Sequence, residues 1–300
     1  MIKDKNFHKI DINRMPIVAW LIFRGCNYNC SYCISRGGAT VISRNITQQK
    51  RIADVPPPYA FLEKFSKYLP GNWIFQLCGV GEPFLAPNFL EIIRGLVKMG
   101  HYINVMTNFS APLKQILEFC DITGEKLINF AASLHLEHGD PREFLKKALL
   151  VQRIIGNKFS VRSVARRGQV LNLKKISQAF RNKGIRFVIQ PERDYMKKRC
   201  TGDPFVKYNK RELKIIKDFH YPGADKNSLR LKGKLCLAGS KYFVVDGKGD
   251  AWRCFPAYSD RRRKEDYLGN MLEGTFKLNK NPSVCLYQCC YCIPPDWLRV

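Results

Sequence analysis

The 300-residue chain is long enough to bury a sizeable core, and its 45% hydrophobic and 25% charged residues are typical of a folded globular protein. No apolar run approaches the roughly 20 residues of a membrane span, and the N-terminus lacks a secretion signal. We therefore expect a cytoplasmic protein without a membrane span. The net charge of +26 favours an anionic partner. A small anionic substrate is favoured over nucleic acid, because the short basic clusters are not interleaved with aromatic residues.

The first two thirds of the chain alternate between strand and helix patterns. Strands are expected at residues 17–23, 73–78, 102–106, 127–134, 159–165 and 185–190. Helices are expected between them, at residues 59–69, 88–99, 113–119, 142–155 and 173–183. Short connections of this kind build a parallel sheet. Six units are too few for a closed eight-fold barrel, so we predict an α/β fold with a partial (βα)6 barrel. Its site should lie at the C-terminal ends of the strands.

Beyond residue 194 the pattern changes to polar sequence with one helix at 210–219, followed by a short hairpin at 242–245 and 251–254. The turn Asp246-Gly247-Lys248-Gly249 supports that hairpin. We predict an N-terminal extension over 1–14, the barrel over 15–195, a linker with a helix over 196–233 and a small cysteine-rich domain over 234–300.

The chain has 12 cysteines, which cluster at 26–33 and at 236–292. Without an export signal, such clusters indicate metal ligands rather than disulfides. The first cluster, Cys26, Cys30 and Cys33, has the spacing C-x3-C-x2-C and directly follows the first predicted strand. Three thiolates hold a 4Fe–4S cluster and leave one iron open. The alternative is a zinc or redox loop, but no fourth ligand lies nearby.

This loop, with the aromatic Tyr32 before its third cysteine, resembles the signature of the radical S-adenosylmethionine (SAM) superfamily. The segment Gly79-Val80-Gly81-Glu82-Pro83, directly after the second predicted strand, is similar to the family's G-G-E-P motif, with Val80 in place of a glycine. The resemblance implies an enzyme that reductively cleaves SAM to a 5′-deoxyadenosyl radical, which abstracts hydrogen from an organic substrate. It also implies a flavodoxin or ferredoxin-type electron donor.

The same resemblance implies a set of SAM-binding residues. Gly81, Glu82 and Pro83 would hold the amino group, and Asn108 and Ser133 would contact the ribose or methionine. Tyr32 belongs to the same set. Arg142 is either a partner of the SAM carboxylate or a surface helix residue. His135 and His138 are either acid–base groups or part of a polar loop, so no catalytic residue is assigned.

The second cysteine cluster begins with Cys236 and Cys254, which are spaced as C-x12-G-x4-C. Four more cysteines follow at Cys285, Cys289, Cys290 and Cys292. This segment resembles the auxiliary-cluster domains called SPASM and twitch, and its length favours the shorter twitch form with one auxiliary 4Fe–4S cluster. Cys289 and Cys292 form a C-x2-C pair, while Cys285 with Cys290 is the competing choice. A structural zinc ribbon is the alternative to a cluster.

In relatives with an auxiliary cluster, that cluster often accepts an electron from the substrate radical. The resemblance therefore implies an oxidation, namely a dehydrogenation. One alternative is a peptide-modifying enzyme that matures or cross-links peptides, and the other is a non-catalytic iron–sulfur or zinc protein that binds RNA. No further domain is evident at either end, which favours a small-molecule substrate over a peptide.

Overall fold

The computed structural model describes residues 15–33, 40–41, 57–77, 81–192, 206–219, 232–260 and 263–287. Its centre is a nine-stranded sheet in the order β12-β11-β10-β1-β4-β5-β6-β7-β8. Seven of these strands run parallel: β1 (Ile17–Trp20), β4 (Ile74–Leu77), β5 (Tyr102–Thr107), β6 (Leu127–Ser133), β7 (Phe159–Ala165), β8 (Phe187–Pro191) and β10 (Tyr242–Val245). The antiparallel strands β11 (Asp250–Trp252) and β12 (Tyr267–Asn270) extend one edge. Among the described residues, β8 and β12 are the edges of the sheet, which is therefore open, as predicted.

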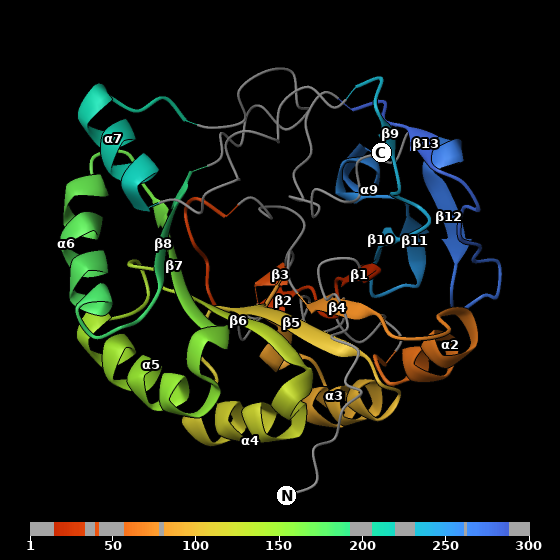
Figure 1. Ribbon diagram of the computed structural model, residues 1–300, viewed down its shortest axis with the longest axis horizontal. Helices are drawn as coiled ribbons and strands as arrows, with labels where there is room; N and C mark the ends of the chain where they lie inside the picture. The colour runs from red at the N-terminus through yellow and green to blue at the C-terminus, as the bar shows by residue number, and fades with distance from the viewer. Residues whose placement is uncertain are drawn as a thin grey trace, which may run out of the picture.

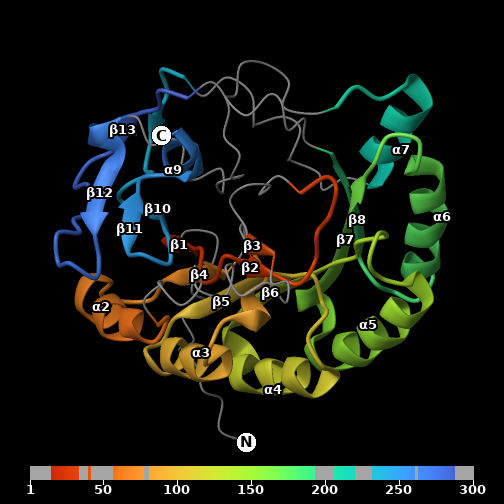
Figure 2. The same ribbon diagram turned by 180° about the vertical axis from the view of Figure 1, so that it is seen from behind.

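Helices follow the outer curve of this sheet (Figure 1). They are α2 (Ala60–Tyr68), α3 (Phe89–Lys98), α4 (Leu113–Thr123), α5 (Pro141–Ile155), α6 (Val170–Arg181) and α7 (Lys210–Phe219). The short helix α9 (Phe255–Asp260) lies at the opposite end of the molecule from α7 (Figure 2). Short 3₁₀ turns occur at η2 (Pro83–Leu85), η3 (Gly124–Lys126), η4 (Gly156–Lys158) and η6 (Lys264–Asp266). The six strands and five helices predicted for the barrel are all present, with ends shifted by a few residues. The helix predicted at 210–219 is present as α7.

Local sequence explains why these helices begin and pack where they do. Asp140 caps α5 by accepting hydrogen bonds from the backbone of Arg142 and Glu143, and Pro141 fills the first helical position. In α3 the buried residues Phe89, Ile92, Ile93 and Leu96 recur at helical spacing. These apolar stripes pack on one face of the sheet, and together they form the main core.

The two faces of the parallel sheet differ in character. Toward the helices, the strands present fully buried side chains such as Phe75, Val105 and Phe130. The other, concave face carries half-buried side chains, most of them polar, including Gln76, Asn104, Met106, Ser133, Arg162 and Gln190. At the β1 and β4 end of this face, Ile17, Ala19 and Ile74 belong to a second, buried apolar cluster. Because successive side chains of a strand alternate between faces, this pattern identifies the concave face as the one available to ligands.

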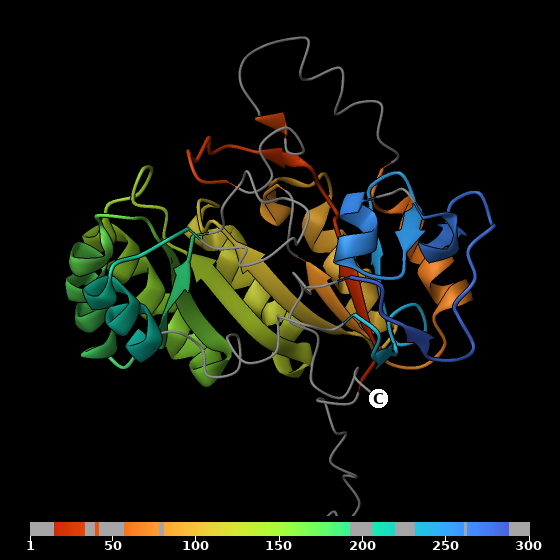
Figure 3. The ribbon, with the colours of Figure 1, turned by 90° about the horizontal axis from the view of Figure 1, so that it is seen from above.

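The C-terminal hairpin joins the barrel sheet directly. Strand β10 pairs in parallel with β1, with Ile17 opposite Tyr242 and Trp20 opposite Val245. Beyond it lie the two-stranded sheet of β9 (Leu235–Cys236) and β13 (Ser283–Val284), and at another place β2 (Gly25–Cys26) pairs with β3 (Thr40–Val41). Figure 3 shows the C-terminal elements at one end of the sheet, beside β1. Within the described part of the chain, no helix is both long and apolar enough to cross a membrane.

Candidate metal centre

The first cysteine loop leaves the C-terminal end of β1, as predicted. The chain runs through residues 21–24 into β2, whose second residue is Cys26. Cys26 and Cys33 are half-buried and Cys30 is buried. Burial raises the pKa of Cys26, and it raises the pKa of Cys30 to about 12, with a further rise caused by the neighbouring thiols of Cys33 and Cys26. Three thiols this close together form a donor set that fits an iron–sulfur cluster, because bound iron stabilises the thiolates.

The loop after β4 packs directly on this cysteine loop. The backbone N–H of Glu82 donates to the carbonyl of Gly25 at 2.8 Å. Gly81 has a φ of +80°, and a Cβ placed on it would lie 2.6 Å from the carbonyl oxygen of Gly25. A glycine is therefore required at this position by its backbone conformation and by the close approach of the two loops. The structure thus brings Gly81 and Glu82 against the backbone of residues 23–25, directly before Cys26.

Glu82 is almost fully buried, and internal donors surround its carboxylate. Oε1 accepts from Thr107 Oγ1 at 2.6 Å and from the backbone of Phe84 at 3.2 Å, while Oε2 accepts from the backbone of Asn108 at 2.6 Å. Burial raises the pKa of Glu82 to about 7, although these hydrogen bonds and the charge of Lys147 oppose the rise. The carboxylate therefore fastens the 81–85 turn to the C-terminal end of β5.

Asn108 connects the end of β5 to the cysteine loop. Its Nδ2 donates to Asn27 Oδ1 at 2.8 Å and lies 3.8 Å from Cys26 Sγ. Its Oδ1 accepts from the backbone of Ser110 at 3.0 Å, and Asn27 Nδ2 donates to Ser110 Oγ at 3.0 Å. The predicted Asn108 therefore meets the predicted Cys26, and the sequence interpretation missed its partners Asn27 and Ser110, which carry no motif.

Ser133 and Arg142, two other residues singled out from the sequence, lie in different settings. Ser133 ends β6, is half-buried, and stands in register with Arg162 of β7 on the concave face. Arg142 is exposed in the first turn of α5, where its backbone binds Asp140. The surface location is the one that the structure gives Arg142.

Tyr32 and His135 meet over Cys30. Tyr32 Oη lies 2.9 Å from His135 Nδ1, which is also 3.3 Å from Cys30 Sγ. Burial lowers the pKa of His135 to about 4, so its ring is neutral at ordinary pH. His138 stacks on Tyr28 with ring centroids 4.4 Å apart. Both histidines of the segment after β6 thus contact the cysteine loop.

A charged group, which we call the Glu137 clamp, secures the same loop and consists of Ser31, Glu137 and Arg166. Glu137 accepts from the backbone of Ser31 at 2.7 Å and from its hydroxyl group. Arg166 donates to Glu137 Oε1 at 2.5 Å, and its guanidinium lies 5.5 Å from the centroid of the Tyr32 ring. Sequence reasoning missed this clamp, and the only available signal was a glutamate between two histidines directly after a strand.

The concave face of the sheet carries a row of amides. Gln76 of β4 stands opposite Asn104 of β5, and Asn104 stands opposite Asn129 of β6. Asn129 Nδ2 donates to Asn104 Oδ1 at 3.1 Å, and Arg186 donates to Asn129 Oδ1 at 3.3 Å. Half-buried amides offer both donors and acceptors, so this surface suits a polar ligand.

The second cysteine group is brought together from three segments. Cys236 is paired with Ser283, and the backbone N–H of Cys285 donates to the carbonyl of Lys234 at 2.8 Å. In an antiparallel pair this register places Cys236 and Cys285 as diagonal neighbours on one face. Burial raises the pKa of Cys285, and the nearby thiol of Cys236 adds to the rise. Cys254 follows β11, is buried, and belongs to the apolar cluster against which Cys236 packs.

Several predicted residues lie outside the described part of the chain. They are Gly79, Val80, Cys289, Cys290 and Cys292. The choice between the two late cysteine pairs therefore stays a prediction, although Cys285 lies beside Cys236.

Comparison with known proteins agrees with this geometry. A model of the Radical SAM superfamily matches residues 20–188. A solved structure described as native anSMEcpe with bound AdoMet and Kp18Cys peptide is 14% identical, with a TM-score of 0.57 over 89% of this chain and 82% of that chain. Streptococcus suis SuiB bound to its precursor peptide SuiA is 14% identical, with a TM-score of 0.53 over 88% of this chain. The chain spans 65% of SuiB, which is less than two thirds of its length. No curated protein sequence matches the chain significantly.

Proposed function

Because the chain belongs to the radical SAM superfamily, we propose that Cys26, Cys30 and Cys33 hold a 4Fe–4S cluster whose open iron takes SAM. When bound, the cluster and SAM together supply the electron and the 5′-deoxyadenosyl radical with which this family abstracts a hydrogen atom. The observation that carries the proposal is the convergence of the cysteine loop, the 81–83 turn and the end of β5 at one edge of the sheet.

The residues around the loop take distinct parts in this proposal. The backbone of Gly81, Glu82 and Pro83 holds the SAM amino group, while the Glu82 carboxylate keeps that turn in place through its three internal donors. Asn108 orients Cys26 and offers a polar edge to the methionine or ribose. Ser133 offers a second polar group to the same ligand from the concave face. Tyr32, which is held by His135, lines the loop for the adenosyl group.

We further propose that Cys236, Cys254 and two later cysteines hold an auxiliary 4Fe–4S cluster and that the reaction is an oxidation. Such a cluster supplies an acceptor for the electron that a substrate radical loses when it forms a double bond. Overall, the substrate loses one hydrogen atom, one proton and one electron. The placement supports this, because the hairpin between Cys236 and Cys254 pairs with β1, the strand that leads into the first cysteine loop.

For the substrate, the amide row and the net charge of +26 support a polar, anionic molecule. A peptide substrate is the second candidate, because anSMEcpe and SuiB, which share the fold, are both described with bound peptides. A flavodoxin or ferredoxin-type protein remains our proposal for the electron donor.

The test is anaerobic reconstitution with iron and sulfide, followed by reduction with dithionite and an assay for 5′-deoxyadenosine. The wild-type chain should form the product and contain about eight irons, as expected for two cubane clusters. Cys26→Ala should abolish the product, and the control Cys120→Ala, which replaces a buried thiol in α4, should not. Product formation by Cys26→Ala would refute the cluster assignment.

The two substrate candidates are separated by coupling. Reconstituted enzyme is incubated with the small-molecule fraction and with the peptide fraction of a cell extract, and 5′-deoxyadenosine is measured above the background. Stimulation by the small-molecule fraction supports the dehydrogenase proposal. Stimulation confined to the peptide fraction supports the second candidate and rejects the first.

A further inference from the structure

A buried ion pair lies beside the second cysteine group. Arg253 and Asp266 have side chains that are only 5% and 1% exposed, and Arg253 Nη1 lies 3.4 Å from Asp266 Oδ1. The backbone N–H of Arg253 also donates to the carbonyl of Asp266 at 2.9 Å. Arg253 comes directly after β11 and directly before Cys254. The pair therefore lies at the point where the hairpin delivers its second cysteine.

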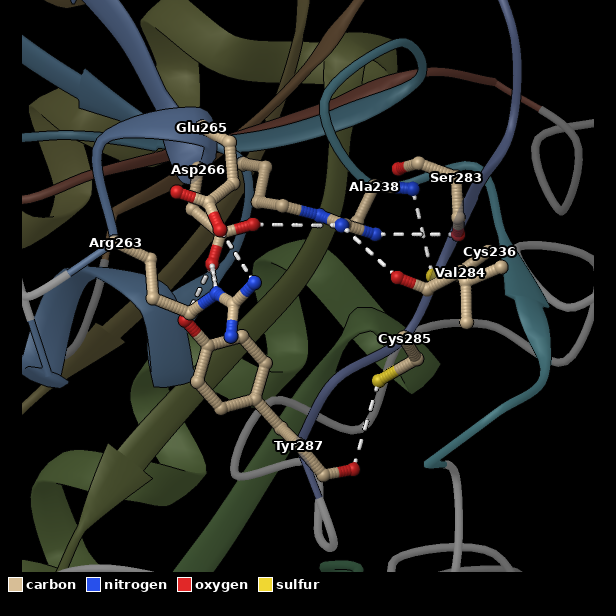
Figure 4. A network of polar contacts seen from close by, with 10 residues as sticks. Cys236, Ala238, Arg263, Glu265, Asp266, Ser283, Val284, Cys285 and Tyr287 are labelled. Atoms are coloured by element: carbon tan, nitrogen blue, oxygen red, sulfur yellow. Dashed lines mark hydrogen bonds and ion pairs between the residues drawn. The ribbon is translucent and has the colours of Figure 1, made fainter.

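The guanidinium of Arg253 reaches from the hairpin to the segment that carries the later cysteines. Nη1 donates to the carbonyl of Val284 at 3.2 Å, and Nη2 donates to the carbonyl of Ser283 at 3.3 Å. Figure 4 shows Asp266 on one side of these contacts and Ser283, Val284, Cys236 and Cys285 on the other. Two consecutive carbonyls of β13 are thus held by one planar group.

Asp266 makes a second connection to the same segment. Its Oδ2 accepts from the hydroxyl group of Tyr287 at 2.6 Å and lies 3.6 Å from Arg263 Nε. Tyr287 follows Cys285 by two residues, and the Cys285 thiol lies 3.6 Å from the carbonyl of Tyr287. The ion pair consequently contacts this segment on both sides of Cys285 (Figure 4).

The energetics of buried ion pairs point to a geometric role for this one. Removing two charges from water offsets most of their attraction, so such a pair adds little net stability compared with apolar side chains of the same volume. Its directional hydrogen bonds nevertheless fix the relative position of the groups that it joins. Here it joins the end of the hairpin, the turn at 263–266 and the segment at 283–287.

We propose that Arg253 is a positioning residue for the auxiliary cluster. It holds the 283–287 segment, which carries Cys285, beside Cys236 and Cys254. This inference rests on the auxiliary cluster proposed above. Arg253 directly precedes Cys254, and its guanidinium contacts the carbonyl of Val284, directly before Cys285, so its positive charge lies close to the thiolates that would carry the cluster. The same charge should make the cluster easier to reduce.

The test uses a full-length chain in which Cys26, Cys30 and Cys33 are replaced by alanine, so that only the auxiliary cluster binds iron. After anaerobic reconstitution, this parent should contain about four irons. Arg253→Met, which keeps the length of the side chain and removes its charge and donors, should bring the iron content below about one. Arg253→Lys, which restores the charge but not the planar guanidinium that binds two carbonyls, should recover part of the iron content. The control is Arg263→Met, because Arg263 pairs with Asp266 but has no bond to Ser283 or Val284, and it should keep about four irons.

Folding and electrostatics are checked separately. In the otherwise wild-type chain, Arg253→Met should still bind about four irons at the first site, which shows that the barrel is folded. Any auxiliary cluster remaining in Arg253→Met should have a more negative midpoint potential than the parent, and Arg253→Lys should return it toward the parent value. If Arg253→Met keeps about four irons, the positioning role is wrong. If the parent itself binds no iron, the auxiliary-cluster proposal fails instead.

Discussion

The contact between Gly81 and the cysteine loop provides the sharpest test of the first site. Gly81 has a φ of +80°, and a Cβ there would lie 2.6 Å from the Gly25 carbonyl oxygen, 2.8 Å from the Arg24 carbonyl carbon and closer still to the Phe23 carbonyl oxygen. All three neighbours are backbone atoms of the segment that carries Cys26. Gly81→Ala therefore cannot be accommodated by the rotation of a side chain, and the loop itself has to move.

The magnitude follows from two separable terms. An alanine at positive φ costs about 1 kcal/mol relative to glycine. Overpacking against a backbone that cannot yield adds roughly 1–3 kcal/mol. Gly71 isolates the first term, because its φ is +76° and a Cβ there would meet nothing within 4 Å. We therefore expect Gly71→Ala to lower the free energy of unfolding by about 1 kcal/mol and Gly81→Ala to lower it by about 2–4 kcal/mol.

The assay combines guanidinium unfolding of the apo proteins with iron analysis after anaerobic reconstitution. Gly71→Ala should bind iron like the wild type, whereas Gly81→Ala should lose the four irons of the first cluster, or about half of the total. Equal destabilisation of the two variants, together with equal iron content, would show that the packing of Gly81 on the cysteine loop is not what holds that loop.

Three further outcomes follow from the described contacts. Burial raises the pKa of Glu82 from 4.5 to about 7, so between these pH values the folded chain binds a proton at Glu82 that the unfolded chain does not. The contribution of this carboxyl to the free energy of unfolding is therefore complete below pH 4.5 and is lost as the pH rises through 7. In Glu82→Gln, position 82 no longer titrates, so the free energy of unfolding should vary with pH by roughly 3 kcal/mol less than in the wild type. An unchanged dependence of the free energy of unfolding on pH would contradict the assignment. Glu137→Ala should speed iron release from the first cluster to a chelator, while Glu143→Ala, in the exposed pair with Lys146, should not. Cys254→Ala should halve the iron content, and retention of the full content would exclude Cys254 as a ligand.

The strands and helices of the barrel were predictable because their signals are local. Phe75 and Leu77 of β4 are buried under the helices while Gln76 between them is not, and this alternation is readable in the sequence. Gly100 and Gly184 mark the ends of helical patterns and adopt positive φ. The positions of the cysteine loop and of the 81–83 turn followed from the rule that the C-terminal ends of parallel strands share one edge.

The pairing of β10 with β1 was not predictable in the same way. The two strands are separated by more than two hundred residues, and a parallel register such as Ile17 with Tyr242 is decided by which buried faces meet, not by a turn between them. The hairpin signal at residues 246–249 predicted β10 and β11 correctly but gave no information about their neighbour. The sequence predicted a small cysteine-rich domain over 234–300, and the structure shows that its hairpin pairs with β1 and extends the barrel sheet.

The same reasoning explains why the Glu137 clamp was invisible and what it adds to the site. A glutamate after a strand is not part of any recognisable motif. Its role becomes visible only in the structure, where Glu137 contacts Ser31 of one loop and Arg166 of another. Once they are placed, the loop after β6 provides a neutral histidine against Cys30 and a carboxylate for the backbone of Ser31. The end of β5 approaches the cysteine loop through Asn108 at Cys26. The cysteine loop is therefore held from two sides, near Cys26 and near Cys30, so its position depends on two strands that are remote from it in sequence.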